Sequence, residues 1–332
     1  MVRVGLVLGA GGVLGGAWLV GGLRALERRT GWSPRNAGLL VGTSSGALVG
    51  ALIAAGVPSS DLLSAGGSRI MAEVVEAEGV PGFSVDLVET LIRYTSGWAA
   101  PAPGSWSLAR AELRRPRPRN LLKVLSGILP EGTASTDGIR TVVERWAPDS
   151  WQATPRFQVV ACDYATGKRT VFGPDWRPNV SLATAVAASC ALPSYYQPVT
   201  IAGRQYVDGA VHSSSNLDLL RGLPLDIVVA LNPLSSRATP RRDPVGRIAA
   251  ARRRQLSRRL GGEAAMLRAT GTSVILLEPV AKDLTARALC GSAAEEVDAL
   301  AALAEQTVAE QLDQPRVRAV LGGDLLAQAA AR

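Results

Sequence analysis

Two long uncharged stretches, residues 5–23 and 37–60, dominate the start of the chain, and both alternate apolar runs with glycine-rich turns. In each stretch a run of strand length precedes a longer run of helix length, so the order is strand, helix, strand, helix. Fully apolar strands that alternate with helices are typical of a parallel sheet buried on both faces. We therefore predict the α/β fold class, with three α/β/α layers around a mostly parallel central sheet.

The first uncharged stretch also has the length of a signal peptide or a membrane anchor. Eight of its nineteen residues, 5–23, are glycine, which lowers helix stability at every turn. We therefore expect a strand, a loop and a helix in this stretch, and neither a removed leader nor an anchor.

Beyond residue 80 the alternation weakens and then resumes. Residues 80–133 are rich in proline, glycine and arginine, and we expect them to leave the main fold. The elements predicted after them are a helix capped by Thr136 or Asp137, a β-hairpin at 156–173, a small-residue helix at 181–193, a hairpin at 199–210, strands at 225–233 and 272–279, and alanine-rich terminal helices. We predict a core at residues 4–221 and an extension at 222–332 that completes the same domain.

The formal net charge of +8 is concentrated in one segment of the chain. Residues 237–259 contain nine arginines and one acid, Asp243, so the remainder of the chain is close to neutral. Such a strip can attract anionic lipid headgroups or phosphates, and it is equally typical of a solvated helix face. Because no aromatic side chain that could stack on bases is interleaved with the arginines, we predict no nucleic-acid partner.

Ser44 lies in a G-x-S-x-G motif, between a predicted strand and a predicted helix. In a nucleophile elbow the turn is so sharp that side chains at the flanking positions would collide with backbone, which requires glycine at Gly42 and Gly46. The following helix start would supply partial positive charge to a developing oxyanion. The motif predicts a nucleophilic serine; a plain turn between strand and helix is the alternative.

The glycine-rich loop at residues 8–18 also joins a strand to a helix. A dinucleotide-binding fingerprint does not fit, because Leu14 stands where its last glycine is needed and no acid follows at the required distance. The loop instead offers backbone N–H groups at Gly11, Gly12 and Val13, which is what an oxyanion hole requires.

Asp208 ends a predicted strand and is followed directly by Gly209. A carboxylate at this place could accept the proton of Ser44 if burial raised its pKa, whereas Asp-Gly alone is typical of a simple turn. The single histidine, His212, would complete a Ser-His-Asp triad, but it follows Asp208 by only four residues. We favour a two-residue Ser44 and Asp208 arrangement and assign His212 a surface or supporting role.

The three cysteines, Cys162, Cys190 and Cys290, are odd in number and widely spaced. This spacing predicts neither disulfides nor a zinc site. With one histidine and no clustered carboxylate loop, we predict no metal and no cofactor.

Four blocks occur in one order along the chain: "GAGGVLGG", "GTSSGAL", "ASCALPSYY" and "DGA". In this order the sequence resembles the patatin-like phospholipases, lipid acyl hydrolases with a Ser-Asp dyad, from about residue 4 to residue 220. The resemblance implies Ser44 as nucleophile, Asp208 as base and the first loop as oxyanion hole, and it requires no histidine. Leu14 departs from the arginine or lysine found in many members, which weakens the case for phospholipid over a neutral ester.

These observations predict a serine acyl hydrolase that cleaves carboxylic esters of lipids, in the cytoplasm. A non-catalytic lipid- or partner-binding protein and an esterase for soluble esters are the alternatives. Contact with an anionic membrane is a further hypothesis, based on the strip Arg237–Arg259 and on Trp98 and Trp106, because tryptophan and arginine suit the lipid–water boundary.

Overall fold

The structure is a computed structural model that describes residues 2–59, 62, 105–113, 126–148, 151, 156–175, 179–238, 244–285 and 293–321. Trp98, Cys290 and most of the 80–133 segment lie outside the described residues, as do the side chain of Trp106 and residues 239–243 of the arginine strip.

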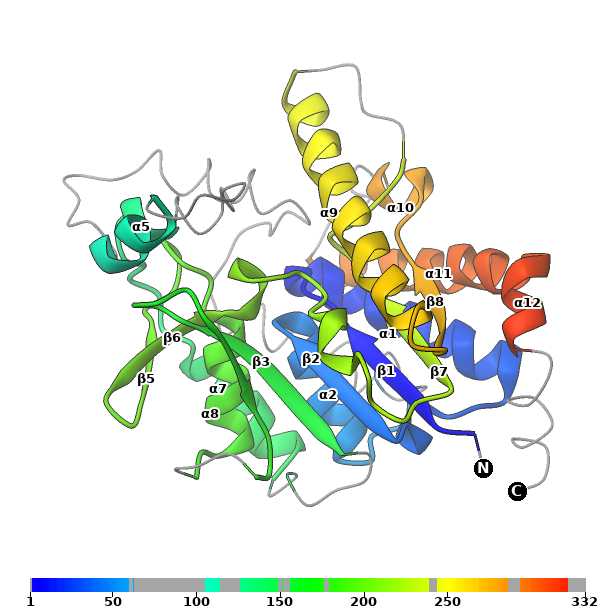
Figure 1. The fold of residues 1–332 in the computed structure, drawn as a ribbon, viewed down its shortest axis with the longest axis horizontal. Coiled ribbons are helices and arrows are strands. Elements are labelled where there is room, and N and C mark those ends of the chain that lie inside the picture. Colours follow the sequence, from blue (N-terminus) through cyan, green and yellow to red (C-terminus); the bar gives the residue numbers. More distant parts are fainter. Residues whose placement is uncertain are drawn as a thin grey trace.

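A mixed sheet forms the centre of the molecule (Figure 1), with the strand order β5-β6-β3-β2-β1-β7-β8 and with β4 paired to β3. The strands are β1 Val4–Leu8, β2 Leu39–Thr43, β3 Phe157–Asp163, β4 Arg169–Phe172, β5 Val199–Ile201, β6 Arg204–Asp208, β7 Ile227–Leu231 and β8 Ser273–Leu277. From β3 through β2, β1 and β7 to β8 every pairing is parallel, whereas β4, β5 and β6 are antiparallel. The predicted mostly parallel sheet is thus confirmed, with antiparallel strands at one end.

Two apolar cores flank the sheet because strand residues alternate between its faces. On β1, Leu6 and Leu8 belong to one core and Val7 to the other. The first core includes residues of α1 Gly12–Thr30, α2 Ser45–Ala54, α7 Asp137–Trp146, α8 Leu182–Cys190, α11 Ala293–Leu312 and α12 Pro315–Leu321. The second face is covered by α9 Pro244–Arg268 and the short η4 Leu217–Leu220. This arrangement confirms the three-layer α/β/α fold.

The first uncharged stretch folds as predicted, into β1, a loop and α1. Helix α1 begins at Gly12 and ends before Gly31, whose φ of 68° is the left-handed cap that glycine favours. Its glycines allow close helix packing: a Cβ at Gly21 would lie 2.1 Å from the carbonyl oxygen of Ala301 in α11. Within the described part of the chain, no helix combines the length and the apolar character needed to cross a membrane.

Four further short helices lie within the described ranges. They are α5 Trp106–Leu113, α10 Ala281–Thr285, η1 Pro34–Asn36 and η3 Gly209–Val211. The arginine strip forms much of α9, and the hairpins predicted at residues 156–173 and 199–210 are the β3–β4 and β5–β6 pairs. The predicted cap of α7 is Thr136, but its side chain makes no capping hydrogen bond, and the Asp137 N–H instead donates to Ser135 Oγ at 3.0 Å.

Candidate active site

Ser44 lies at the turn between β2 and α2, with φ 55° and ψ −125°. A non-glycine residue in this region carries backbone strain of roughly 1–3 kcal/mol, which surrounding packing must hold in place. The residue is buried, with 7% of its surface exposed. The strand, the strained residue and the helix together form the nucleophile-elbow geometry that the sequence predicts.

Gly42 and Gly46 have no room for a side chain. A Cβ at Gly42 would lie 2.6 Å from the Cα of Ala47, and one at Gly46 would lie 2.1 Å from the carbonyl oxygen of Leu8. The absence of a side chain at Gly42 allows the sharp turn of the elbow. Its absence at Gly46 allows α2 to approach the end of β1. The geometric reason given for both glycines is therefore present in the structure.

Asp208 reaches the elbow because β3 is longer than its neighbour β2. Strand β2 ends at Thr43, opposite Val160, and β3 continues to Asp163. The antiparallel strand β6 pairs with this extra length and returns toward the end of β2, with Asp208 opposite Ala161. Gly209 completes the approach, since a Cβ there would lie 2.3 Å from the carbonyl oxygen of Val160.

The Ser44 hydroxyl donates a hydrogen bond to the Asp208 carboxylate, and the Ala210 N–H donates another at 2.8 Å. Asp208 is 3% exposed. Burial raises its pKa from 3.8 to about 6, and the two hydrogen bonds oppose this shift only in part. A carboxyl group of this kind can take up and release a proton near neutral pH.

The first loop lies beside this pair at the start of α1. Gly11 caps the helix, and Gly12 has a φ of 63°. The N–H groups of a first helical turn have no partner within the helix, so those of Gly12 and Val13 are donors of the kind that an oxyanion needs. The Ala10 N–H donates to the Ser214 carbonyl at 2.8 Å, which joins this loop to the segment after Asp208.

Ser189 is a site residue that the sequence reasoning missed. It lies near the end of α8, in the block "ASCALPSYY", and is fully buried. Its hydroxyl accepts a hydrogen bond from the Ser44 N–H at 2.8 Å and donates one to the Val160 carbonyl at 2.6 Å. Ser189 therefore fixes the strained elbow to β3 and occupies the N–H group of Ser44 itself.

A polar segment after Asp208, residues 213–216, was also missed. Asn216, fully buried, donates from Nδ2 to the Thr43 hydroxyl at 3.1 Å and to the Ser213 carbonyl at 2.7 Å. Three serines and an asparagine in succession inside a buried region were a signal available in the sequence. Through Asn216 the loop that follows Asp208 is joined to the residue before Ser44.

His212 lies in the turn that follows Asp208, and its backbone N–H donates to the Gly209 carbonyl at 2.9 Å. The Asp208 carboxylate itself accepts hydrogen bonds from Ser44 and from the Ala210 N–H. Cys162 and Cys190 are buried thiols that form no disulfide with each other. Over the described ranges, no three histidine, cysteine, aspartate or glutamate side chains gather as metal ligands would.

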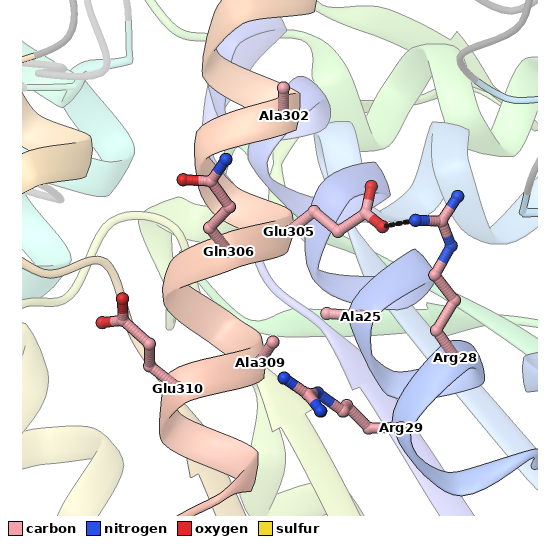
Figure 2. Close-up of a pocket in the computed structure, with 8 residues that line it drawn as sticks. All are labelled: Ala25, Arg28, Arg29, Ala302, Glu305, Gln306, Ala309 and Glu310. Atoms are coloured by element: carbon pink, nitrogen blue, oxygen red, sulfur yellow. Dashed lines mark ion pairs between the residues drawn. The ribbon is translucent and has the colours of Figure 1, made fainter.

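A separate hollow of about 690 Å³ lies between the last turns of α1 and the middle of α11 (Figure 2). Two residues that line it, Arg28 and Glu305, form an ion pair at 2.6 Å, and a third, Arg29, pairs with Asp313 at 3.1 Å. At 1.5 Å per residue, Arg28 is about 24 Å along α1 from Gly12. The hollow therefore lies well away from the loop at the start of α1 and from Ser44.

The structural likenesses are distant. VipD from Legionella pneumophila has 13% identity and a TM-score of 0.43, covering 99% of this chain and 73% of its own. Human GIVD cytosolic phospholipase A2, in complex with methyl gamma-linolenyl fluorophosphonate, has 14% identity and a TM-score of 0.41. The alignment covers 99% of this chain and 60% of the phospholipase chain. The heterodimeric complex ExoU–SpcU of Pseudomonas aeruginosa has 17% identity and a TM-score of 0.39. The alignment covers 95% of this chain and 51% of the matched chain. This chain thus spans less than two thirds of the length of two of these three proteins.

At such TM-scores these likenesses carry no argument about the site. The sequence itself matches the family described as patatin-like phospholipase over residues 6–221, from β1 to the end of η4. That match includes the elbow, the first loop, Ser189 and Asp208. Because it spans more than half of the 332 residues, the chain belongs to the patatin-like phospholipase family.

Proposed function

We propose that this protein is a serine acyl hydrolase that cleaves carboxylic esters of lipids with a Ser44–Asp208 dyad. Family membership supports lipid ester hydrolysis in general. The observation that carries the finer proposal is the hydrogen bond from the strained Ser44 to a buried carboxylate whose pKa is raised to about 6. An ordinary exposed aspartate would be too weak a base for a serine hydroxyl.

In the first half of the reaction, Ser44 Oγ attacks the ester carbonyl carbon while its proton passes to Asp208. The N–H groups of Gly11, Gly12 and Val13 stabilise the oxyanion, since the N–H of Ser44 is held by Ser189. The bond to the leaving alcohol then breaks. The alcohol takes the proton from Asp208 and leaves the acyl group on Ser44.

In the second half, water attacks the acyl carbonyl and gives a proton to Asp208. As the bond to Ser44 breaks, Asp208 returns this proton to Ser44 Oγ and the fatty acid departs. The cycle needs one group that alternates between base and acid, and a pKa near 6 suits both tasks near neutral pH. No step requires His212.

For its location we propose the cytoplasm, with reversible contact at an anionic membrane through the arginine strip. We also propose that residues 222–332 complete the domain. This is supported by β7, which pairs with β1 on one side and β8 on the other.

Hydrolysis of phospholipids, lysophospholipids and soluble esters by four proteins tests the function. Ser44→Ala and Asp208→Asn should lose nearly all turnover on every substrate, because each removes one half of the dyad. His212→Ala should retain most of it and serves as the matched control. Equal activity of wild type and Ser44→Ala would refute the nucleophile.

The same panel separates the alternatives. Turnover of soluble esters alone would indicate an esterase, in line with Leu14 in the first loop. A fluorophosphonate probe that fails to label wild-type Ser44 would favour a non-catalytic binding protein.

A further inference from the structure

Helix α9 is longer than the sheet that it covers. Its 25 residues span about 37 Å, whereas a five-residue strand such as β7 spans about 17 Å. The helix ends beside the start of β8, at the amino edge of the sheet, where Arg268 donates to the Val274 carbonyl at 2.8 Å. Its first half therefore extends past the carboxyl edge, the edge at which Ser44 lies, as the raised end of α9 shows in Figure 1.

Contacts along α9 divide it into a projecting half, the residues before Ser257, and a root, from Ser257 to Arg268. The chain that leaves β7 meets the middle of the helix: the Ser236 N–H donates to the Arg253 carbonyl at 3.4 Å, and Arg237 donates to Ser257 Oγ at 3.3 Å. From Ser257 onward the inward residues are buried in the second core. Before Ser257 none of the described side chains of α9 is buried.

The solvent face of α9 carries a basic stripe, which we define as Arg247, Arg254 and Arg258. Their i, i+7, i+11 spacing places them on one side of the helix. Arg247 and Arg258 are exposed and Arg254 is half-buried. Next to the stripe Ile248 is 61% exposed, the largest value among the exposed large apolar side chains of the described residues.

The root of α9 is fastened to the loop that carries the proposed base. Glu263, 5% exposed, accepts hydrogen bonds from the hydroxyls of Ser213 at 2.9 Å and Ser215 at 2.6 Å, five and seven residues after Asp208. Arg259 pairs with the same carboxylate at 3.1 Å. A surface that bound the projecting half would thus be held in a fixed relation to Ser44.

We propose that α9 docks this protein on anionic lipid surfaces through its basic stripe, with Arg247 and Arg254 on the projecting half, Arg258 at the start of the root, and Ile248 at the apolar boundary of the headgroups. The proposal rests on the lipid substrate proposed above, and it adds the element that brings the carboxyl edge against the bilayer. Arginines beside an exposed apolar side chain fit a lipid interface. A nucleic acid fits less well, because the helix has no aromatic side chain for stacking.

Vesicle flotation in a Ser44→Ala background tests docking without turnover, so failure of the hydrolase proposal and failure of docking are distinguishable. The protein should float with vesicles of phosphatidylcholine and phosphatidylserine, and not with phosphatidylcholine alone. An arginine near an anionic surface contributes about 1 kcal/mol, so replacing the three stripe arginines by glutamine should weaken partitioning roughly 100-fold. Added salt should also weaken partitioning, because it screens the attraction between the arginines and the anionic lipid.

The matched control replaces three exposed arginines of helices on the opposite face of the sheet, Arg140 and Arg145 in α7 and Arg316 in α12, by glutamine. It removes the same charge and should leave flotation within about threefold of the parent, because these side chains are far from the proposed surface. Ile248→Ser should weaken binding without changing charge, and its exposure makes it safe for folding.

Equal losses in the stripe and control variants would overturn the proposal, because they would indicate a general charge effect. Binding to duplex DNA that exceeds binding to anionic vesicles, and that depends on the stripe, would also overturn it in favour of a nucleic-acid partner.

Discussion

Replacing the proposed base should inactivate the protein and also make its fold more stable. In Asp208→Asn the amide keeps the size of the carboxyl group and can still accept from the Ala210 N–H. It removes a charge that is almost completely buried. We therefore expect the ionised carboxylate to lower the free energy of unfolding, a loss that is retained because catalysis needs this group.

The sign of this effect follows from the pKa of Asp208, which is raised from 3.8 to about 6 in the folded protein. Between these values the folded chain keeps a proton that the unfolded chain has released, so folding stability falls as the pH rises. Above about pH 6 the loss is complete, and at 1.36 kcal/mol for each pH unit it amounts to about 3 kcal/mol. The asparagine side chain in the Asp208→Asn variant does not ionise, so this variant should recover up to this amount at neutral pH.

Guanidinium unfolding of wild type and Asp208→Asn at about pH 8 and about pH 4 measures the difference. The variant should be more stable at the higher pH, and the gap should nearly close at the lower one, where Asp208 is protonated in the fold. Asp163→Asn is the matched control. Asp163 is 5% exposed, but it accepts from Thr166 at 2.8 Å and pairs with Arg204 at 3.5 Å, so its replacement should not stabilise.

Two results would refute this reasoning. If Asp208→Asn were less stable than wild type at the higher pH, the carboxylate would be a net stabilising group and its pKa would not be raised by burial. If the gap were equal at both pH values, the effect would come from packing and not from ionisation.

Three further predictions concern the same site. With a soluble ester, kcat/KM should rise with pH through about 6 and then level, because ionised Asp208 is the base; an inflexion near pH 4 would contradict this. Gly46→Ala would place a methyl group 2.1 Å from the Leu8 carbonyl oxygen and should destabilise the fold by more than about 3 kcal/mol, whereas Gly262→Ala, with open space, should not. Ser189→Ala removes the partner of the buried Ser44 N–H and should cost about 1–3 kcal/mol in unfolding experiments and lower kcat more than it raises KM.

The parallel half of the fold was predictable because its physical causes are local. Fully apolar strands, glycine caps such as Gly31 and the elbow at Ser44 each have a short sequence pattern. The burial of Asp208 could be anticipated only as a condition for a base, because no local pattern reports how deeply a strand end lies.

The remaining features depend on contacts between distant segments. Nothing near Asp208 states that β6 returns antiparallel along the extra length of β3, yet this register brings it to Ser44. Ser189 is 145 residues from Ser44, and its hydroxyl has no special sequence context apart from the family block. Glu263 would be read as one acid on a basic helix, and its role follows only from its bonds to Ser213 and Ser215.

The loop after Asp208 contacts every part of the proposed machinery. Asp208 itself binds Ser44, Asn216 binds the residue before it, and Ser214 accepts from the first loop. Through its serines the same loop is bound to the root of α9 by Glu263. A change in the angle of α9 would therefore act first on this loop, and only through it on the nucleophile. It follows that breaking the attachment with Glu263→Ala should affect turnover at a membrane surface more than docking, because the basic stripe itself is unchanged.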